Sequence, residues 1–76
     1  MKEMAMFLLK SLVVNKENVV IEMKEERNNV YLMAKVDPAD KGKVIGRDGS
    51  IIKAIRIVLG ASGAKANKKV TLRLED

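Results

Sequence analysis

Residues 40–53 read DKGKVIGRDGSIIK, and this stretch decides the fold because a helical pattern stops and restarts within it. Residues 41–45 are long enough for one helical turn, and the isoleucines that follow begin an apolar stripe with helical spacing. Gly46 and Gly49 separate the two helical segments, because a glycine inside a helix costs about 1 kcal/mol relative to alanine. We therefore predict a short helix, a four-residue turn bounded by glycines, and a second, longer helix.

The predicted turn offers hydrogen-bond donors to an anion. The first amide groups of a helix lack partners within it and carry the positive end of its dipole. Gly46 and Gly49 have no Cβ atoms that would hold a phosphate away, and both can adopt left-handed backbone angles. The cations around the turn are Lys41, Lys43, Arg47 and Lys53. Phosphate is the anion that best matches this pattern.

Three polar residues in the stretch are candidate helix caps. Asp40 precedes the short helix, and we expect its carboxylate to accept the first amide hydrogens of that helix. Asp48 either lowers the affinity of the turn for phosphate or caps the second helix instead, and the spacing allows Ser50 to cap it as well.

The flanking sequence predicts the remaining elements. An apolar stripe of helical period runs through residues 2–14, and residues 19–24, 30–36 and 70–74 alternate as strands do. Asn28-Asn29 suits a two-residue hairpin turn. The order is α-β-β-α-α-β, which predicts an α+β fold with a three-stranded sheet covered on one face by three helices.

Two features admit alternative interpretations. The N-terminal helix has more apolar residues than one face needs, so the extra ones either bury against the sheet or meet a second subunit. These residues are Met6, Phe7, Val13 and Val14.

A second G-x-x-G, residues 60–63, has no basic residue inside it and is interpreted as a loosened end of the long helix, which would stop between Leu59 and Lys65.

Composition narrows the classes of function. The chain has 76 residues, enough for one domain spanning residues 1–76, and it contains no cysteine and no histidine. Disulfides, thiolate metal sites, a histidine base and a cysteine nucleophile are therefore excluded, and we expect no catalytic residue, cofactor, metal or small-molecule substrate. The longest apolar run near the N-terminus, residues 4–9, is too short to span a membrane. The cytoplasm is the expected location.

Charge is distributed unevenly along the chain. Residues 1–40 carry six basic and seven acidic side chains, whereas residues 41–73 carry nine basic and one acidic. A basic segment of this kind is typical of a surface that meets a polyanion. Part of it, the cluster of Lys65, Lys68 and Lys69 before the last strand, is more typical of a solvated loop.

At Val44-Ile45-Gly46-Arg47-Asp48-Gly49 the chain resembles the I-G-x-x-G signature of KH domains, and its order of elements resembles the bacterial type II form. With Ala54-Ile55-Arg56 after the loop, it is most similar to the small single-KH proteins of the KhpA family. The resemblance implies that the loop clamps about four nucleotides of single-stranded RNA, with bases in an aliphatic groove. Ile45 and Ile52 would line that groove, and residues 27–29 would form its opposite lip.

The resemblance also implies a set of RNA contacts and partners. The expected contacts are Lys41, Lys43, Val44, Ile45, Gly46, Arg47, Asp48, Gly49, Ser50, Ile52, Lys53 and Arg56. The leading hypothesis is a non-catalytic single-stranded RNA-binding protein that acts as a chaperone or adaptor. The alternative is a module for protein interaction with weak or vestigial RNA binding, which forms a homodimer or pairs with a KhpB-like KH protein.

Overall fold

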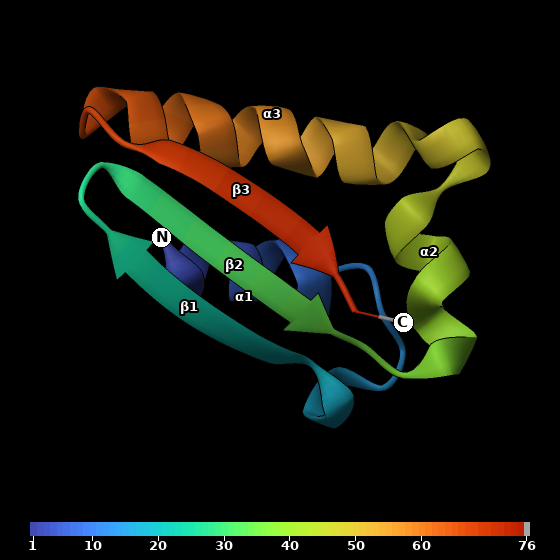
Figure 1. The fold of residues 1–76 in the computed structure, drawn as a ribbon. Helices are drawn as coiled ribbons and strands as arrows, with labels where there is room; N and C mark the ends of the chain where they lie inside the picture. Colours follow the sequence, from blue (N-terminus) through green and yellow to red (C-terminus); the bar gives the residue numbers. More distant parts are fainter. Residues whose placement is uncertain (76) are drawn as a thin grey trace.

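The computed structural model describes residues 1–75 and confirms the predicted α+β class (Figure 1). In chain order the elements are α1 (Lys2–Lys10), η1 (Lys16–Asn18), β1 (Val20–Glu26), β2 (Asn29–Lys35), η2 (Pro38–Asp40), α2 (Lys41–Ile45), η3 (Arg47–Gly49), α3 (Ser50–Lys65) and β3 (Lys69–Leu74), where η marks a single 3-10 turn.

The strands form one sheet with the order β1-β2-β3. β1 and β2 are an antiparallel hairpin, whereas β3 returns parallel to β2 after the two helices between them. A parallel return needs a long crossover, which α2 and α3 provide. The crossover leaves β3 at the edge of the sheet, alongside α3 (Figure 1).

The core lies between the sheet and the helices α1 and α3, which lie behind and beside it in Figure 1. Its largest fully buried apolar side chains come from every layer. They are Leu9, Leu32, Leu59, Val30 and Val44. α2 closes the end of the sheet beside α3, and the opposite face of the sheet is not covered by any helix of residues 1–75.

The first helix is shorter than predicted. It ends at Lys10 because the Ser11 hydroxyl donates to the carbonyl of Leu8 at 2.7 Å, and the chain then leaves the helical path. The turn carries Val13 into the core, where it is 3% exposed. The suggestion that Val13 meets a second subunit is therefore wrong, whereas Phe7 and Val14 remain exposed and Met6 is half-buried.

The hairpin turn differs by one residue from the prediction. Glu26 pairs with Asn29, so the turn residues are Arg27 and Asn28, and Arg27 has a φ of 56°. Asn29 belongs to β2. Met23 of β1 is 44% exposed.

α3 runs without a break through both glycines of the second G-x-x-G. Gly60 has open space around it, whereas a Cβ at Gly63 would lie 2.5 Å from the Val70 side chain and 2.8 Å from the Lys68 carbonyl oxygen. Gly63 therefore lets β3 begin close to the end of α3. The second motif is a packing feature of a regular helix.

Candidate nucleic-acid interface

The turn between α2 and α3 has a backbone that glycine makes possible. Gly46 ends α2 with φ 76° and ψ 176°, and a Cβ there would lie 2.6 Å from Cγ1 of Ile51. Asp48 and Gly49 both adopt left-handed angles, with φ of 55° and 75°. These angles reverse the chain so that α3 starts directly after the loop.

Two amide groups of this turn lack a protein partner. The Gly46 amide donates to Gly42, the Gly49 amide to Gly46 at 3.2 Å, and the Ser50 amide to Arg47. Within residues 1–75, no acceptor is found for the backbone amides of Arg47 and Asp48. Both residues are exposed, so these donors can meet a ligand at the positive end of the 16-residue helix α3.

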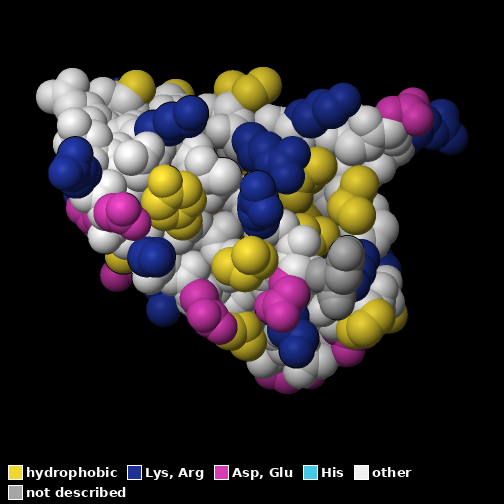
Figure 2. Space-filling view, viewed as in Figure 1, with side chains coloured by type: hydrophobic (Ala, Val, Ile, Leu, Met, Phe, Trp, Pro, Cys, Tyr) yellow, Lys and Arg dark blue, Asp and Glu magenta, His cyan; other side chains and the backbone are white. Residues whose placement is uncertain are grey.

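Positive charge surrounds the turn. Arg47, Lys43 and Lys53 are exposed and Lys41 is half-buried. Lys43 lies 3.7 Å from the carboxylate of Asp40, and the other three form no ion pair within the described residues. Figure 2 shows Lys and Arg side chains along the part of this face that covers α3 and β3, with an acidic side chain beside a basic one at the protruding tip.

Arg56 connects α3 to the free edge of the sheet. Its Nε donates to the carbonyl of Leu72 at 3.1 Å, so this carbonyl of β3 points away from β2. The bond holds Arg56 beside the strand edge while the terminal nitrogens of its guanidinium keep their capacity to donate. Arg56 therefore contributes a cation where α3 packs against β3.

Two residues expected to contact RNA are part of the core instead. Val44 is fully buried and Ile52 is 7% exposed, because both point toward the sheet from the two helices beside the turn. This corrects the prediction that Ile52 lines a groove and that Val44 contacts RNA. Ile45 is 38% exposed and remains available for an apolar contact.

The capping predictions were wrong. The carboxylate of Asp40 does not cap α2, and neither Asp48 nor Ser50 caps α3 through its side chain. Asp40 is buried and accepts instead from the segment after α1, at 3.0 Å from the Asn15 amide and 3.3 Å from the Val14 amide. Tertiary hydrogen bonds therefore replace the local cap.

These hydrogen bonds determine the ionisation of Asp40. The backbone amide of Asn15 is the main cause that lowers the pKa of this carboxyl below its ordinary value of 3.8. The Val14 amide, the Asn15 side chain and Lys43 act in the same direction, and burial opposes them. The charged form is favoured, and it ties α2 to the end of α1.

The hairpin lies at the other end of α3 from the glycine turn. Lys68 pairs with Glu25, and the Lys69 amide donates to the Asn28 carbonyl at 2.7 Å, so the hairpin contacts the start of β3. Sixteen residues of helix span about 24 Å. Residues 27–29 therefore do not form a lip directly across from the turn, which corrects that expectation.

Two supporting residues were not identified from the sequence. The sequence does not indicate a role for Asn15, because its hydrogen-bond partner Asp40 is 25 residues away. Ile51 belonged to the predicted apolar stripe, but only the structure shows that its side chain fills the space a Cβ at Gly46 would need.

Residues 1–75 contain no helix long and apolar enough to cross a membrane, and no group of three or more acidic side chains that could hold a metal ion.

Comparison with known proteins gives a consistent match. The family model for the KH domain of KhpA and KhpB matches residues 2–74. The "RNA-binding protein KhpA" of Borreliella burgdorferi is 40% identical over 97% of this chain and 90% of its own length. The proteins of the same name in Clostridium perfringens and Aquifex aeolicus are 43% and 39% identical over 97% of this chain, and over 99% and 94% of their own lengths. No solved structure matches the chain significantly.

Proposed function

Because the chain belongs to the KhpA/KhpB family of KH domains, we propose that it is a non-catalytic RNA-binding protein that holds a single strand at the Gly46–Gly49 loop. The similar proteins from other bacteria carry the name RNA-binding protein. We place its action in the cytoplasm, as a chaperone or adaptor for RNA.

The observation that carries this proposal is the pair of unpartnered amides at Arg47 and Asp48. They lie in an exposed turn at the start of α3, and backbone donors at such a position bind phosphate oxygens. Arg47 and Lys53 add charge that attracts the strand from a distance.

The bases of the bound RNA can contact an apolar surface and a polar surface beside the loop. Ile45 supplies exposed aliphatic surface beside the loop, and β3 presents the backbone groups of an edge strand. Arg56 lies at that edge through its bond to Leu72. We expect the bases to be bound mainly by apolar contact with this surface, and therefore modest selectivity among sequences.

Amide chemical shifts test the location of the site. In a 15N NMR titration with a short single-stranded RNA, the signals of Arg47 and Asp48 should move most. Gly60 and Gly63 provide an internal control, because they repeat the G-x-x-G spacing inside a regular helix. Shifts that leave residues 46–49 unchanged would contradict the proposal.

Salt dependence tests the kind of contact. Phosphate binding predicts that the logarithm of the association constant falls with the logarithm of salt concentration, at about −0.7 per phosphate neutralised on a single strand. A response independent of salt would favour binding through bases or through a protein partner.

A second candidate function is self-association through the helical layer. Phe7 of α1 is 71% exposed and Ile57 of α3 is 72% exposed. Between the two helices lies an apolar hollow of about 300 Å³, whose lining includes Leu12 and Val58. Exposed apolar surface of this extent is typical of a protein contact. A homodimer, or a heterodimer with a KhpB-like protein of the same fold, would cover it.

Sedimentation tests this second candidate directly. A dimer that dissociates on the change Ile57→Ser or Phe7→Ser would support it, and a wild-type chain that sediments as a monomer at every concentration would contradict the homodimer. Two loops joined in one dimer would bind a longer RNA more tightly through their high effective concentration.

A further inference from the structure

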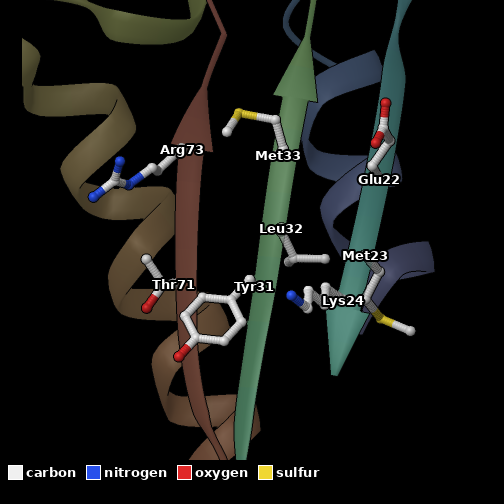
Figure 3. A pocket seen from close by; sticks show the side chains of 8 residues that line it. All are labelled: Glu22, Met23, Lys24, Tyr31, Leu32, Met33, Thr71 and Arg73. Carbon is white, nitrogen blue, oxygen red and sulfur yellow. The ribbon is translucent and has the colours of Figure 1, made fainter. Parts of the chain in front are cut away.

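The open face of the sheet carries a hollow that the loop does not use. Its volume is about 400 Å³, and it lies over the middle of the three strands on the side away from α1 (Figure 3). Tyr31 lies within it and is 43% exposed. It is the only tyrosine of a chain that has no tryptophan.

The sheet register determines the neighbours of this ring. Tyr31 pairs with Lys24 of β1 on one side and with Thr71 of β3 on the other. In Figure 3 the Lys24 amine extends toward the ring and the Thr71 side chain lies next to it. Arg73 lies on the same face two residues beyond Thr71, about 7 Å along the strand.

We propose that Tyr31 is a platform on which one base of a single-stranded RNA stacks, with Lys24 and Arg73 holding the phosphates on either side of that base. This inference rests on the proposed function, because the stacked base would belong to a nucleotide beyond those bound at the loop. It adds a second contact surface to the protein.

The chemistry of the hollow favours a nucleotide. An aromatic ring in a positively charged groove is the combination with which single-stranded nucleic acids are bound, since each nucleotide brings a flat base and an anionic phosphate. The Thr71 hydroxyl can donate to or accept from the base edge. Among residues 1–75, Glu22 is the one acidic residue that lines the hollow, and it pairs with Met33, two residues along β2 from Tyr31.

A second copy of the chain fits this surface less well. Two copies that met through this face would bring four cations, Lys24 and Arg73 of each chain, against two Glu22 carboxylates, so an excess of like charge would repel. An RNA strand supplies the opposite charge.

The geometry also connects the hollow to the loop. Arg73 follows Leu72, whose carbonyl accepts from Arg56 of α3. In Figure 3 the Arg73 side chain extends across β3 toward α3. A strand that runs from the loop along α3 and over β3 would therefore meet Arg56, then Arg73, and then the ring of Tyr31.

RNA length separates this contact from the loop. We expect a ten-nucleotide RNA of mixed sequence to quench the fluorescence of Tyr31, and a four-nucleotide RNA to leave it nearly unchanged. Tyr31→Ala should weaken binding of the ten-nucleotide RNA by roughly 5- to 150-fold, the range of one base stack, and alter binding of the four-nucleotide RNA less than about twofold. Tyr31→Phe should keep the affinity, because phenylalanine retains the ring.

The outcomes distinguish the two proposals. If Tyr31→Ala binds the ten-nucleotide RNA like the wild type while Arg47→Asp does not, the inference about the sheet is overturned and the loop proposal stands. If Arg47→Asp binds both RNAs normally, the loop proposal fails. If Tyr31→Ala changes the sedimentation of the protein without changing RNA affinity, the face is a protein contact and the inference is overturned.

Discussion

Asp40 and Asn15 are 25 residues apart, yet the Asp40 carboxylate accepts both the backbone amide of Asn15 at 3.0 Å and its side-chain amide at 3.1 Å. This contact joins the start of α2 to the segment that follows α1. Because α2 leads directly into the Gly46–Gly49 loop, Asp40 helps to hold the loop in place without touching its ligand.

Asp40→Asn should lower the melting temperature by several degrees. The change keeps the shape of the side chain but removes the charge and replaces one acceptor oxygen by a donor group, which would face the amide of Val14 or that of Asn15, depending on the oxygen replaced. Thermal unfolding followed by circular dichroism measures the effect. Glu17→Gln is the matched control, since Glu17 is exposed, and it should change the melting temperature little.

The same contact predicts a dependence of stability on pH. The pKa of Asp40 is lower in the folded protein than its ordinary value of 3.8. Its contribution to stability is therefore complete above about pH 4 and is lost as the pH falls through the lower, folded value. When the pH is lowered from about 7 to about 2, the melting temperature of Asp40→Asn should fall less steeply at the acid end than that of the wild type. Equal slopes for the variant and the wild type would show that another group controls acid unfolding.

The glycines of the chain should respond differently to alanine. Gly46→Ala combines a positive φ with a Cβ placed 2.6 Å from Ile51, so we expect a loss of about 3 kcal/mol in unfolding free energy. Gly49→Ala should lower the unfolding free energy by only about 1 kcal/mol. This loss comes from the left-handed backbone angles, because the new Cβ makes ordinary contacts at 3.7 and 3.8 Å.

Gly60→Ala is the control in the same experiment. Its Cβ would meet nothing within 4 Å, and alanine favours the helix, so the variant should gain up to about 1 kcal/mol. Urea unfolding of the three variants gives all the values. A Gly46→Ala variant as stable as the wild type would contradict the description of the loop.

Asp48→Asn should bind RNA more tightly. Asp48 places a negative charge beside the amides that we propose bind phosphate, and two unit charges 4 Å apart in water interact by about 1 kcal/mol. The expected gain is about fivefold, measured by fluorescence anisotropy with a labelled single-stranded RNA. Asparagine also tolerates the left-handed φ of 55°, so the loop should keep its shape. Unchanged or weaker binding would indicate that the carboxylate itself contacts the RNA.

The sequence predicted what depends on local pattern. The strands, the short helix α2 and the glycine turn follow from alternation, from period and from Gly46 and Gly49, and the structure confirms them. The role of Asp40 was missed, because it depends on a tertiary contact that no neighbouring residue signals. The burial of Ile52 was missed for a related reason, since residues next to a binding loop can face inward as well as outward.

The neighbours of Tyr31 on the open face of the sheet could not be predicted from the sequence either. The alternation of β2 predicted that Tyr31 points away from the core, but it gave no neighbours for the ring. Lys24 lies beside it through the antiparallel register of the β1–β2 hairpin, and Thr71 through the parallel return of β3.

The most direct test of the central claim compares two identical substitutions in different turns. Arg47→Asp places a second carboxylate in the loop, whereas Arg27→Asp makes the same change at an exposed residue of the hairpin turn. In titrations with a four-nucleotide RNA at one salt concentration, we expect Arg47→Asp to abolish binding and Arg27→Asp to weaken it only slightly, with both variants folded. Equal affinities for Arg47→Asp and the wild type, or equal losses in both variants, would contradict binding at the loop.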